Sequence, residues 1–151
     1  MVVFEIAGRR YGVPAGDVQE VLRAVLPTPL PRAPEAVEGV INLRGRVVPV
    51  FDLRRRFRLP LREVEPGDNL IVARADGRTV VLRVDRVTGL VRLQAADVEE
   101  ARGVVPGVEY VSWLARTADD LVLVHDLGTF LSRAEAAALD AALPGAEENG
   151  P

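Results

Sequence analysis

The sequence predicts an all-β protein, and three observations lead to this fold class. Valine is abundant, and most apolar segments are short, roughly four to eight residues, which is typical of strands rather than helices. The chain contains 11 prolines and 13 glycines, which interrupt these segments at many points. Asp76-Gly77 stands between two apolar segments, and it is a strong hairpin signal because both residues tolerate positive φ.

The glycines, prolines and turn residues between the apolar segments mark the ends of the predicted strands. Arg44-Gly45 is a second candidate turn, for the same conformational reason as Asp76-Gly77. The predicted strands are, in chain order, Val2–Ala7, Arg10–Val13, Glu20–Val25, Val40–Leu43, Val47–Phe57, Leu70–Ala75, Thr79–Val84 and Leu121–Asp126.

Two helical segments are predicted. The first is a short helical turn over Asp17–Leu22, after which the chain extends again. The second begins at Ser132, which has Glu135 three residues later and so has the pattern of a capping box. An alanine-rich segment follows, and we expect the helix to end at about Leu143.

The two halves of the chain share a weak internal repeat. Gly8-Arg9 and the strand after it resemble Gly77-Arg78 and its following strand, and Val48–Leu53 (VPVFDL) resembles Val122–Leu127 (VLVHDL). Two interpretations fit these matches. They are either chance similarities among valine-rich strands, or traces of two similar small barrels packed through a hydrophobic seam.

Composition limits the class of protein. The chain has 151 residues, 48% of them hydrophobic and 27% charged, which is typical of one soluble domain. We place this domain at residues 1–143 and a flexible polar tail at residues 144–151. No apolar run approaches the ~20 residues that span a bilayer. With no cysteine and no leader pattern at the N-terminus, we expect a cytoplasmic protein without direct membrane insertion.

The residue types needed for catalysis or metal binding are scarce. His125 is the single histidine, and no nucleophile or orienting residue is spaced to make it a base, so we interpret it as a structural or surface residue. One histidine, no cysteine and no calcium-type carboxylate loop argue against a metal site. We therefore expect a protein without enzymatic activity and without a cofactor.

The arginine cluster Arg54–Arg58 (RRRFR) is of the kind that binds RNA in some proteins. The net charge of −3 and an aromatic content of 5% oppose this interpretation, because RNA-binding surfaces combine positive charge with stacking aromatic rings. We interpret the arginines as the solvated end of a strand and expect no nucleic-acid partner.

The segment Gly39–Phe57 (GVINLRGRVVPVFDLRRRF) resembles the signature of the CheW-type chemotaxis coupling proteins. The resemblance continues in register on both sides and covers about residues 2–143. The other matching segments are Tyr11–Pro14, Val18–Val21, Thr28–Pro31, Ala33-Pro34, Val84–Val87, and Leu121–Leu131 with the final helix.

This resemblance implies two five-stranded, SH3-like β-barrels that share a hydrophobic core, with a short C-terminal helix. It also implies a non-enzymatic adaptor that couples the cytoplasmic tips of methyl-accepting chemoreceptors to the regulatory domain of a CheA-type histidine kinase. Such an adaptor works at receptor arrays beneath the inner membrane. The alternative is a divergent CheW-like module that has lost one docking contact and regulates another adaptor or pathway component.

The resemblance also points to individual residues. Arg44 matches the family arginine implicated in receptor contact, and Val18, Glu20 and Gly39 match other positions of the receptor-binding groove. A second interpretation stays open for three of them. Arg44 also fits a solvated arginine of a hairpin turn. Val18 fits plain core packing equally well, and Gly39 fits a purely conformational requirement for glycine.

Three positions depart from the family pattern. Val81 replaces a usual glycine, Arg83 stands where the family is commonly apolar, and Trp113, the single tryptophan, replaces a second usual glycine. We expect Val81 and Trp113 to alter a partner surface. Trp113 is either a new interface anchor, since tryptophan is enriched at binding hot spots, or a residue that fills core space.

Overall fold

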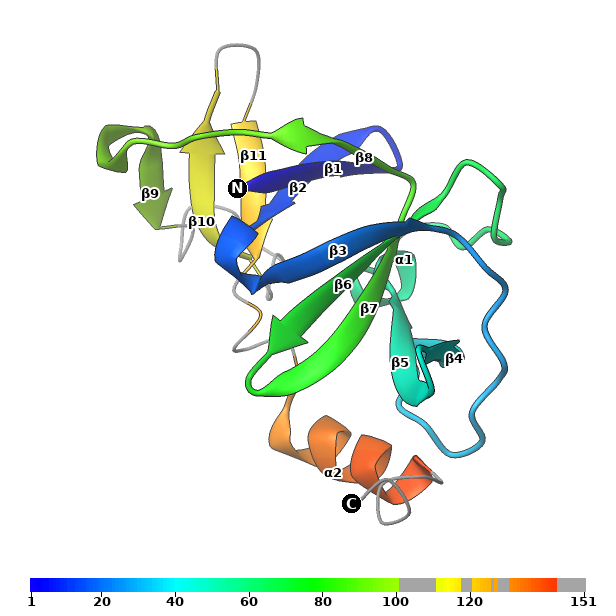
Figure 1. Ribbon diagram of the computed structural model, residues 1–151. Coiled ribbons are helices and arrows are strands. Elements are labelled where there is room, and N and C mark those ends of the chain that lie inside the picture. The colour runs from blue at the N-terminus through cyan, green and yellow to red at the C-terminus, as the bar shows by residue number, and fades with distance from the viewer. Residues whose placement is uncertain (101–110, 118–120, 126, 128–130, 144–151) are drawn as a thin grey trace.

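The computed structural model describes residues 1–100, 111–117, 121–125, 127 and 131–143, which form two β-sheets and a C-terminal helix (Figure 1). One sheet has five strands in the order β3-β6-β7-β5-β4. Its strands are β3 (Val18–Arg23), β4 (Val37–Leu43), β5 (Arg46–Asp52), β6 (Asn69–Ala75) and β7 (Arg78–Val84).

The other sheet has six strands in the order β8-β1-β2-β11-β10-β9. Its strands are β1 (Val2–Ile6), β2 (Arg9–Val13), β8 (Arg86–Leu90), β9 (Val98–Glu100), β10 (Val111–Arg116) and β11 (Leu121–His125). The helical elements are the 3-10 turns η1 (Ala15–Asp17) and η2 (Ala95–Asp97), and the helices α1 (Leu53–Arg56) and α2 (Arg133–Ala142).

Both sheets are built around the same arrangement of strands. In each, an antiparallel hairpin lies beside a strand that runs parallel to the second member of the hairpin. β11 runs parallel to β2 beside the β1–β2 hairpin, and β5 runs parallel to β7 beside the β6–β7 hairpin. The sequence repeat VPVFDL and VLVHDL begins in these two parallel strands. It therefore reflects a repeat in topology and not a chance similarity.

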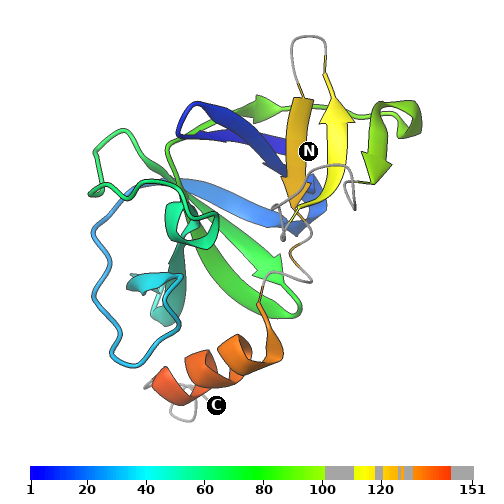
Figure 2. The same ribbon diagram turned by 180° about the vertical axis from the view of Figure 1, so that it is seen from behind.

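The chain crosses between the two sheets twice. After the β1–β2 hairpin the chain enters the other sheet, where β3 pairs with β6. After the β6–β7 hairpin the chain returns, and β8 pairs with β1. Figure 2 shows the arrangement from behind, with α2 at the end of the molecule where the β6–β7 hairpin turns. The five-stranded sheet is thus formed by the continuous segment from β3 to β7, and the six-stranded sheet joins β1 and β2 to the strands that follow β7.

The main hydrophobic core lies between the sheets and is shared by them. It includes Phe4 and Tyr11 from the six-stranded sheet, and Phe51, Ile71 and Leu82 from the five-stranded sheet. Two smaller cores accompany it, one on each sheet. The shared core and the all-β class confirm the predicted fold class, although β9 gives one sheet a strand more than the predicted five.

Local turn chemistry sets three of the hairpins. Ala7-Gly8, Arg44-Gly45 and Asp76-Gly77 all have positive φ at both residues, between 51° and 85°. This is the geometry of type I′ turns, whose twist matches that of the flanking strands. The turns predicted at Arg44-Gly45 and Asp76-Gly77 are confirmed.

The C-terminal helix is confirmed as well. Ser132 caps α2: its hydroxyl accepts a hydrogen bond from the Glu135 N–H at 3.0 Å, and the Glu135 carboxylate accepts one from the Ser132 N–H at 3.0 Å. The helix buries Leu139 in the shared core. The predicted tail at residues 144–151 lies outside the described residues.

The helical turn predicted over Asp17–Leu22 is wrong. The chain makes only the 3-10 turn Ala15–Asp17, and Val18 already begins β3. Along β3, half-buried residues alternate with exposed ones, and the strand pairs with β6 across the sheet. This two-residue period and the backbone pairing override the weak local preference for a helix.

The strand predicted over Val47–Phe57 is wrong in its second half, because β5 ends at Asp52 and α1 follows. The Asp52 carboxylate caps α1 by accepting a hydrogen bond from the Arg54 N–H at 3.0 Å. The helix buries Arg54 and Arg56, so the interpretation of the arginine cluster as a solvated strand end is wrong for these two.

Candidate functional site

Arg44 lies at the tip of the β4–β5 hairpin. The Gly45 N–H donates to the Asn42 side-chain oxygen at 2.7 Å, which fixes the turn. Arg44 adopts a φ of 53° and points its side chain outward, with 71% of it exposed. The turn therefore presents a cation on a rigid hairpin.

The Arg44 guanidinium binds Glu20 on β3 in fork geometry. Nη1 and Nη2 donate to the two carboxylate oxygens at 2.5 and 2.8 Å. The hydrogen bond from Arg44 lowers the pKa of Glu20, and the same bond raises the pKa of Arg44. Two residues that the resemblance singled out separately are thus one structural unit, and both remain charged at neutral pH.

The Arg44–Glu20 pair connects the two ends of the five-stranded sheet. β3 lies at one end of the strand order, and the β4–β5 hairpin lies at the other. A backbone bridge between Thr28 and Val40 joins the chain after β3 to β4, with two hydrogen bonds of 2.8 Å. One ion pair and one backbone bridge therefore link β3 and the chain after it to the β4–β5 hairpin at the opposite end of the strand order.

Val18 and Gly39 have clear structural roles. Val18 is half-buried and packs against the shared core, which supports the core-packing interpretation of this residue. Gly39 lies under the Thr28 bridge, and a Cβ atom at this position would stand 2.3 Å from the Thr28 carbonyl oxygen. The close approach of two backbones requires glycine here.

Val81 lies in the smaller core of the five-stranded sheet with Val50 and Val72, and none of its surface is exposed. The expectation that Val81 forms part of a partner surface therefore does not hold for its side chain. A valine in this position fills core volume, and it can affect binding only through the packing of the strands around it.

Trp113 stands on β10, half-buried, and packs against the small core of the six-stranded sheet. Its backbone lies opposite Val124 on β11. Part of its indole thus fills core space while part reaches the surface. Both interpretations of Trp113 agree with this position.

A buried ionic cluster surrounds Arg83 on β7. Its guanidinium binds Glu38 at 2.7 Å, Asp52 at 3.0 Å and Asp68 at 3.1 Å. Burial opposes the charge of Arg83, but its carboxylate partners raise the pKa of Arg83 above the ordinary value. Burial likewise acts to raise the pKa of Asp68, yet hydrogen bonds from Arg62 and the Glu65 N–H hold it below its usual range.

Asp85 extends this cluster to the junction between the sheets. It follows β7 and precedes β8, and its carboxylate accepts hydrogen bonds from the Ala7 N–H at 2.8 Å and from Arg54 at 2.7 Å. Arg62 reaches both Asp85 and Asp68. Sequence analysis missed this cluster, and its one signal was Arg83, an arginine between the apolar residues Leu82 and Val84.

The remaining candidates for chemistry are accounted for in the fold. His125 is 1% exposed and stacks on Phe57 with ring centroids 4.5 Å apart, so it is a structural residue as predicted. Within the described part of the chain, no group of three or more potential metal ligands is found. No helix in that part is both long and apolar enough to cross a membrane.

Comparison with known proteins agrees with this architecture. A family model described as CheW-like domain matches residues 1–135. The chain is 26% identical to the chemotaxis protein CheW of Treponema pallidum, over 89% of this chain and 83% of the relative. It is 28% identical to CheW of Klebsiella aerogenes, over 92% and 85% respectively. It is 40% identical to the protein FrzA of Myxococcus xanthus, over 63% of this chain and 59% of FrzA.

The fold is likewise similar to a solved structure. The crystal structure of the scaffolding protein TtCheW from Thermoanaerobacter tengcongensis superposes with a TM-score of 0.81 at 31% identity. The match covers 89% of this chain and 92% of that one. Because the family model spans most of the chain and the fold agrees over nearly the whole structure, this chain belongs to the CheW-like domain family of chemotaxis scaffold proteins.

Proposed function

We propose that this protein is a non-enzymatic adaptor that couples the cytoplasmic tips of chemoreceptors to a CheA-type histidine kinase. The observation that carries this proposal is the presence, in a CheW-like fold, of Arg44 on an exposed turn. The sequence resemblance associates this position with receptor contact. Its place of action is the cytoplasmic face of the receptor array, and its chemistry is binding free energy alone.

The Arg44–Glu20 pair suits contact with a helical receptor tip. A guanidinium has more N–H donors than the two used for Glu20, and these can reach carbonyl or carboxylate oxygens on a helix. Because Glu20 holds the side chain in one orientation, less conformational entropy is lost when the receptor binds.

A pull-down with purified receptor tip and kinase regulatory domain tests the proposal. Arg44→Ala should weaken receptor binding by roughly fivefold to thirtyfold, the range expected for an interface arginine that contributes 1–2 kcal/mol. Binding of the kinase domain should stay unchanged. Arg46→Ala is the matched control, because Arg46 is an exposed arginine of the same hairpin.

Two outcomes would contradict the proposal. If Arg44→Ala binds the receptor tip as well as the unmodified chain does, Arg44 has no part in that contact. If the chain binds the receptor tip but no CheA-type regulatory domain, the alternative applies: a divergent module that has lost one docking contact and regulates another adaptor or pathway component.

A further inference from the structure

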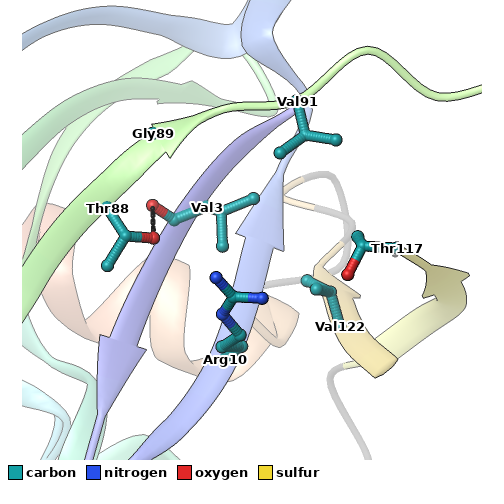
Figure 3. A pocket seen from close by; sticks show the side chains of 7 residues that line it. All are labelled: Val3, Arg10, Thr88, Gly89, Val91, Thr117 and Val122. Carbon is teal, nitrogen blue, oxygen red and sulfur yellow. Dashed lines mark hydrogen bonds between the residues drawn. The ribbon is translucent and has the colours of Figure 1, made fainter. Parts of the chain in front are cut away.

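The six-stranded sheet carries a pocket with a volume of about 250 Å³, away from the Arg44–Glu20 pair (Figure 3). Buried Val3 on β1 and buried Val122 on β11 belong to the small core of this sheet, so this part of the pocket wall is fixed by packing. Its apolar walls come from Val3, Val91 and Val122, and its polar groups come from Arg10, Thr88 and Thr117.

Arg10 is the charged group of this pocket, and the carboxylate expected to pair with it binds another arginine instead. Glu5 stands directly opposite Arg10 in the β1–β2 hairpin, where a cross-strand ion pair would form. The Glu5 carboxylate instead binds Arg86 on the other neighbouring strand at 2.9 Å. Within the described residues, the Arg10 guanidinium has no hydrogen-bond or ion-pair partner.

The half-buried Arg10 side chain extends into the pocket. Figure 3 shows its guanidinium directed toward the side chain of Val3, with Val122 and Thr117 on one side. The Thr88 hydroxyl is already used, because it donates to the Val3 carbonyl oxygen at 3.2 Å. The pocket thus combines one available cation with a preformed apolar wall.

The size of the pocket favours a side chain over a cofactor. Its volume of about 250 Å³ lies below the roughly 300–1,000 Å³ of typical small-molecule sites. We propose that it is a docking site for a segment of a partner protein that presents a glutamate or aspartate next to a small apolar residue. The carboxylate would bind Arg10 in fork geometry, and the apolar side chain would lie against Val91, the half-buried valine of the lining.

A larger hollow among the described residues differs in the charges that line it. It has a volume of about 610 Å³ and lies beside the ionic cluster, with Asp52 and Arg83 in its lining. These two groups are buried and bind each other at 3.0 Å. The other two arginines of the lining, Arg55 and Arg62, are paired with Asp52 and Asp68, so each arginine there already has a carboxylate partner. The available cation at Arg10 is therefore what gives the smaller pocket its preference for an acidic partner.

The docking site is independent of the proposed receptor contact. Arg10 lies on the six-stranded sheet, whereas Arg44 and Glu20 belong to the five-stranded sheet. An acidic segment bound at Arg10 would leave the Arg44 hairpin exposed. The chain could thus hold two protein partners at once, one on each sheet.

Nuclear magnetic resonance of the ¹⁵N-labelled full chain tests the proposal with the peptide acetyl-Val-Glu-Ala-amide. The peptide is added up to roughly 10 mM, since so small a contact sustains only millimolar affinity. We expect amide shifts at Val3, Gly89 and Val122. Arg10→Gln should weaken binding about fivefold, as expected for loss of a partly exposed ion pair. The spectrum of this variant also reports whether it folds.

Matched controls decide the outcome. Arg23→Gln, at an exposed arginine on the other sheet, should bind the peptide as the unmodified chain does. Equal binding of the glutamine peptide acetyl-Val-Gln-Ala-amide, equal binding by Arg10→Gln, or no shifts at the pocket would each overturn the proposal. Tighter binding of free isovalerate than of the glutamate peptide would also overturn it, in favour of a site for small carboxylates.

Discussion

Replacing Gly39 with alanine tests whether this signature glycine serves the fold or the partner. The added Cβ would lie 2.3 Å from the Thr28 carbonyl oxygen and 2.8 Å from its carbon. Both are backbone atoms, so no flexible side chain can move aside. The segment around Thr28 must withdraw from β4, and the bridge between Thr28 and Val40 must open or distort.

The size of the effect follows from these contacts. The bridge contributes two hydrogen bonds of 2.8 Å, each with a net value of about 0.5–1.5 kcal/mol. Overpacking of a rigid site costs about 1–3 kcal/mol more. We therefore expect Gly39→Ala to lower the free energy of unfolding by about 2–6 kcal/mol, a large part of the ~5–15 kcal/mol typical of a domain.

Urea denaturation followed by circular dichroism measures this loss, and Gly16→Ala is the matched control. No atom lies within 4 Å of a Cβ at Gly16, and this glycine has no positive φ, so the control should change stability by less than about 1 kcal/mol. A loss below about 0.5 kcal/mol for Gly39→Ala would refute the packing argument. If the variant then failed to bind the receptor tip, Gly39 would have a direct role in the contact.

Three further perturbations test the rest of the fold. Arg83→Met should cost about 3–5 kcal/mol in urea unfolding, because it removes the buried cation shared by Glu38, Asp52 and Asp68, and the last two of these carboxylates are buried; a loss below about 1 kcal/mol would contradict this. Ser132→Ala should cost about 0.5–2 kcal/mol by removing the cap of α2, measured as a lower thermal midpoint. Because the pKa of Asp68 is lowered in the folded state, its stabilising contribution is present above the ordinary carboxyl pKa and is lost as pH falls through the folded value. Asp68→Asn should therefore flatten the fall in stability between about pH 5 and pH 2, and an unchanged slope would contradict the assignment.

Prediction from sequence succeeded where a few neighbouring residues decide the structure. Arg44-Gly45 and Asp76-Gly77 form hairpin turns because these residues accept positive φ, and Ser132 begins a helix because its hydroxyl reaches the Glu135 N–H. It failed at β3, where pairing with β6 outweighs a weak local helix signal. It also failed at α1, where Asp52 ends the strand and caps a short helix.

The candidate site was likewise predicted only in part. The family signature singled out Arg44, Glu20, Val18 and Gly39, but the sequence could not distinguish contact residues from packing residues among them. Arg44 and Glu20 are 24 positions apart, and only the folded sheet brings their charges to 2.5 Å. The requirement for glycine at position 39 likewise depends on where the Thr28 backbone crosses β4.

The all-β class, two of the hairpin turns, the capped C-terminal helix and the family resemblance could be predicted from the amino-acid sequence, because strand periodicity, turn dihedrals and caps are encoded within a few consecutive residues. The burial of Arg54, Arg56 and Arg83, the packing of Val81 in a core and the loss of the expected partner of Arg10 became evident only in the folded chain. Burial and ion pairing depend on which distant strands become neighbours. Those neighbours are set by the order in which the chain places its strands in the two sheets.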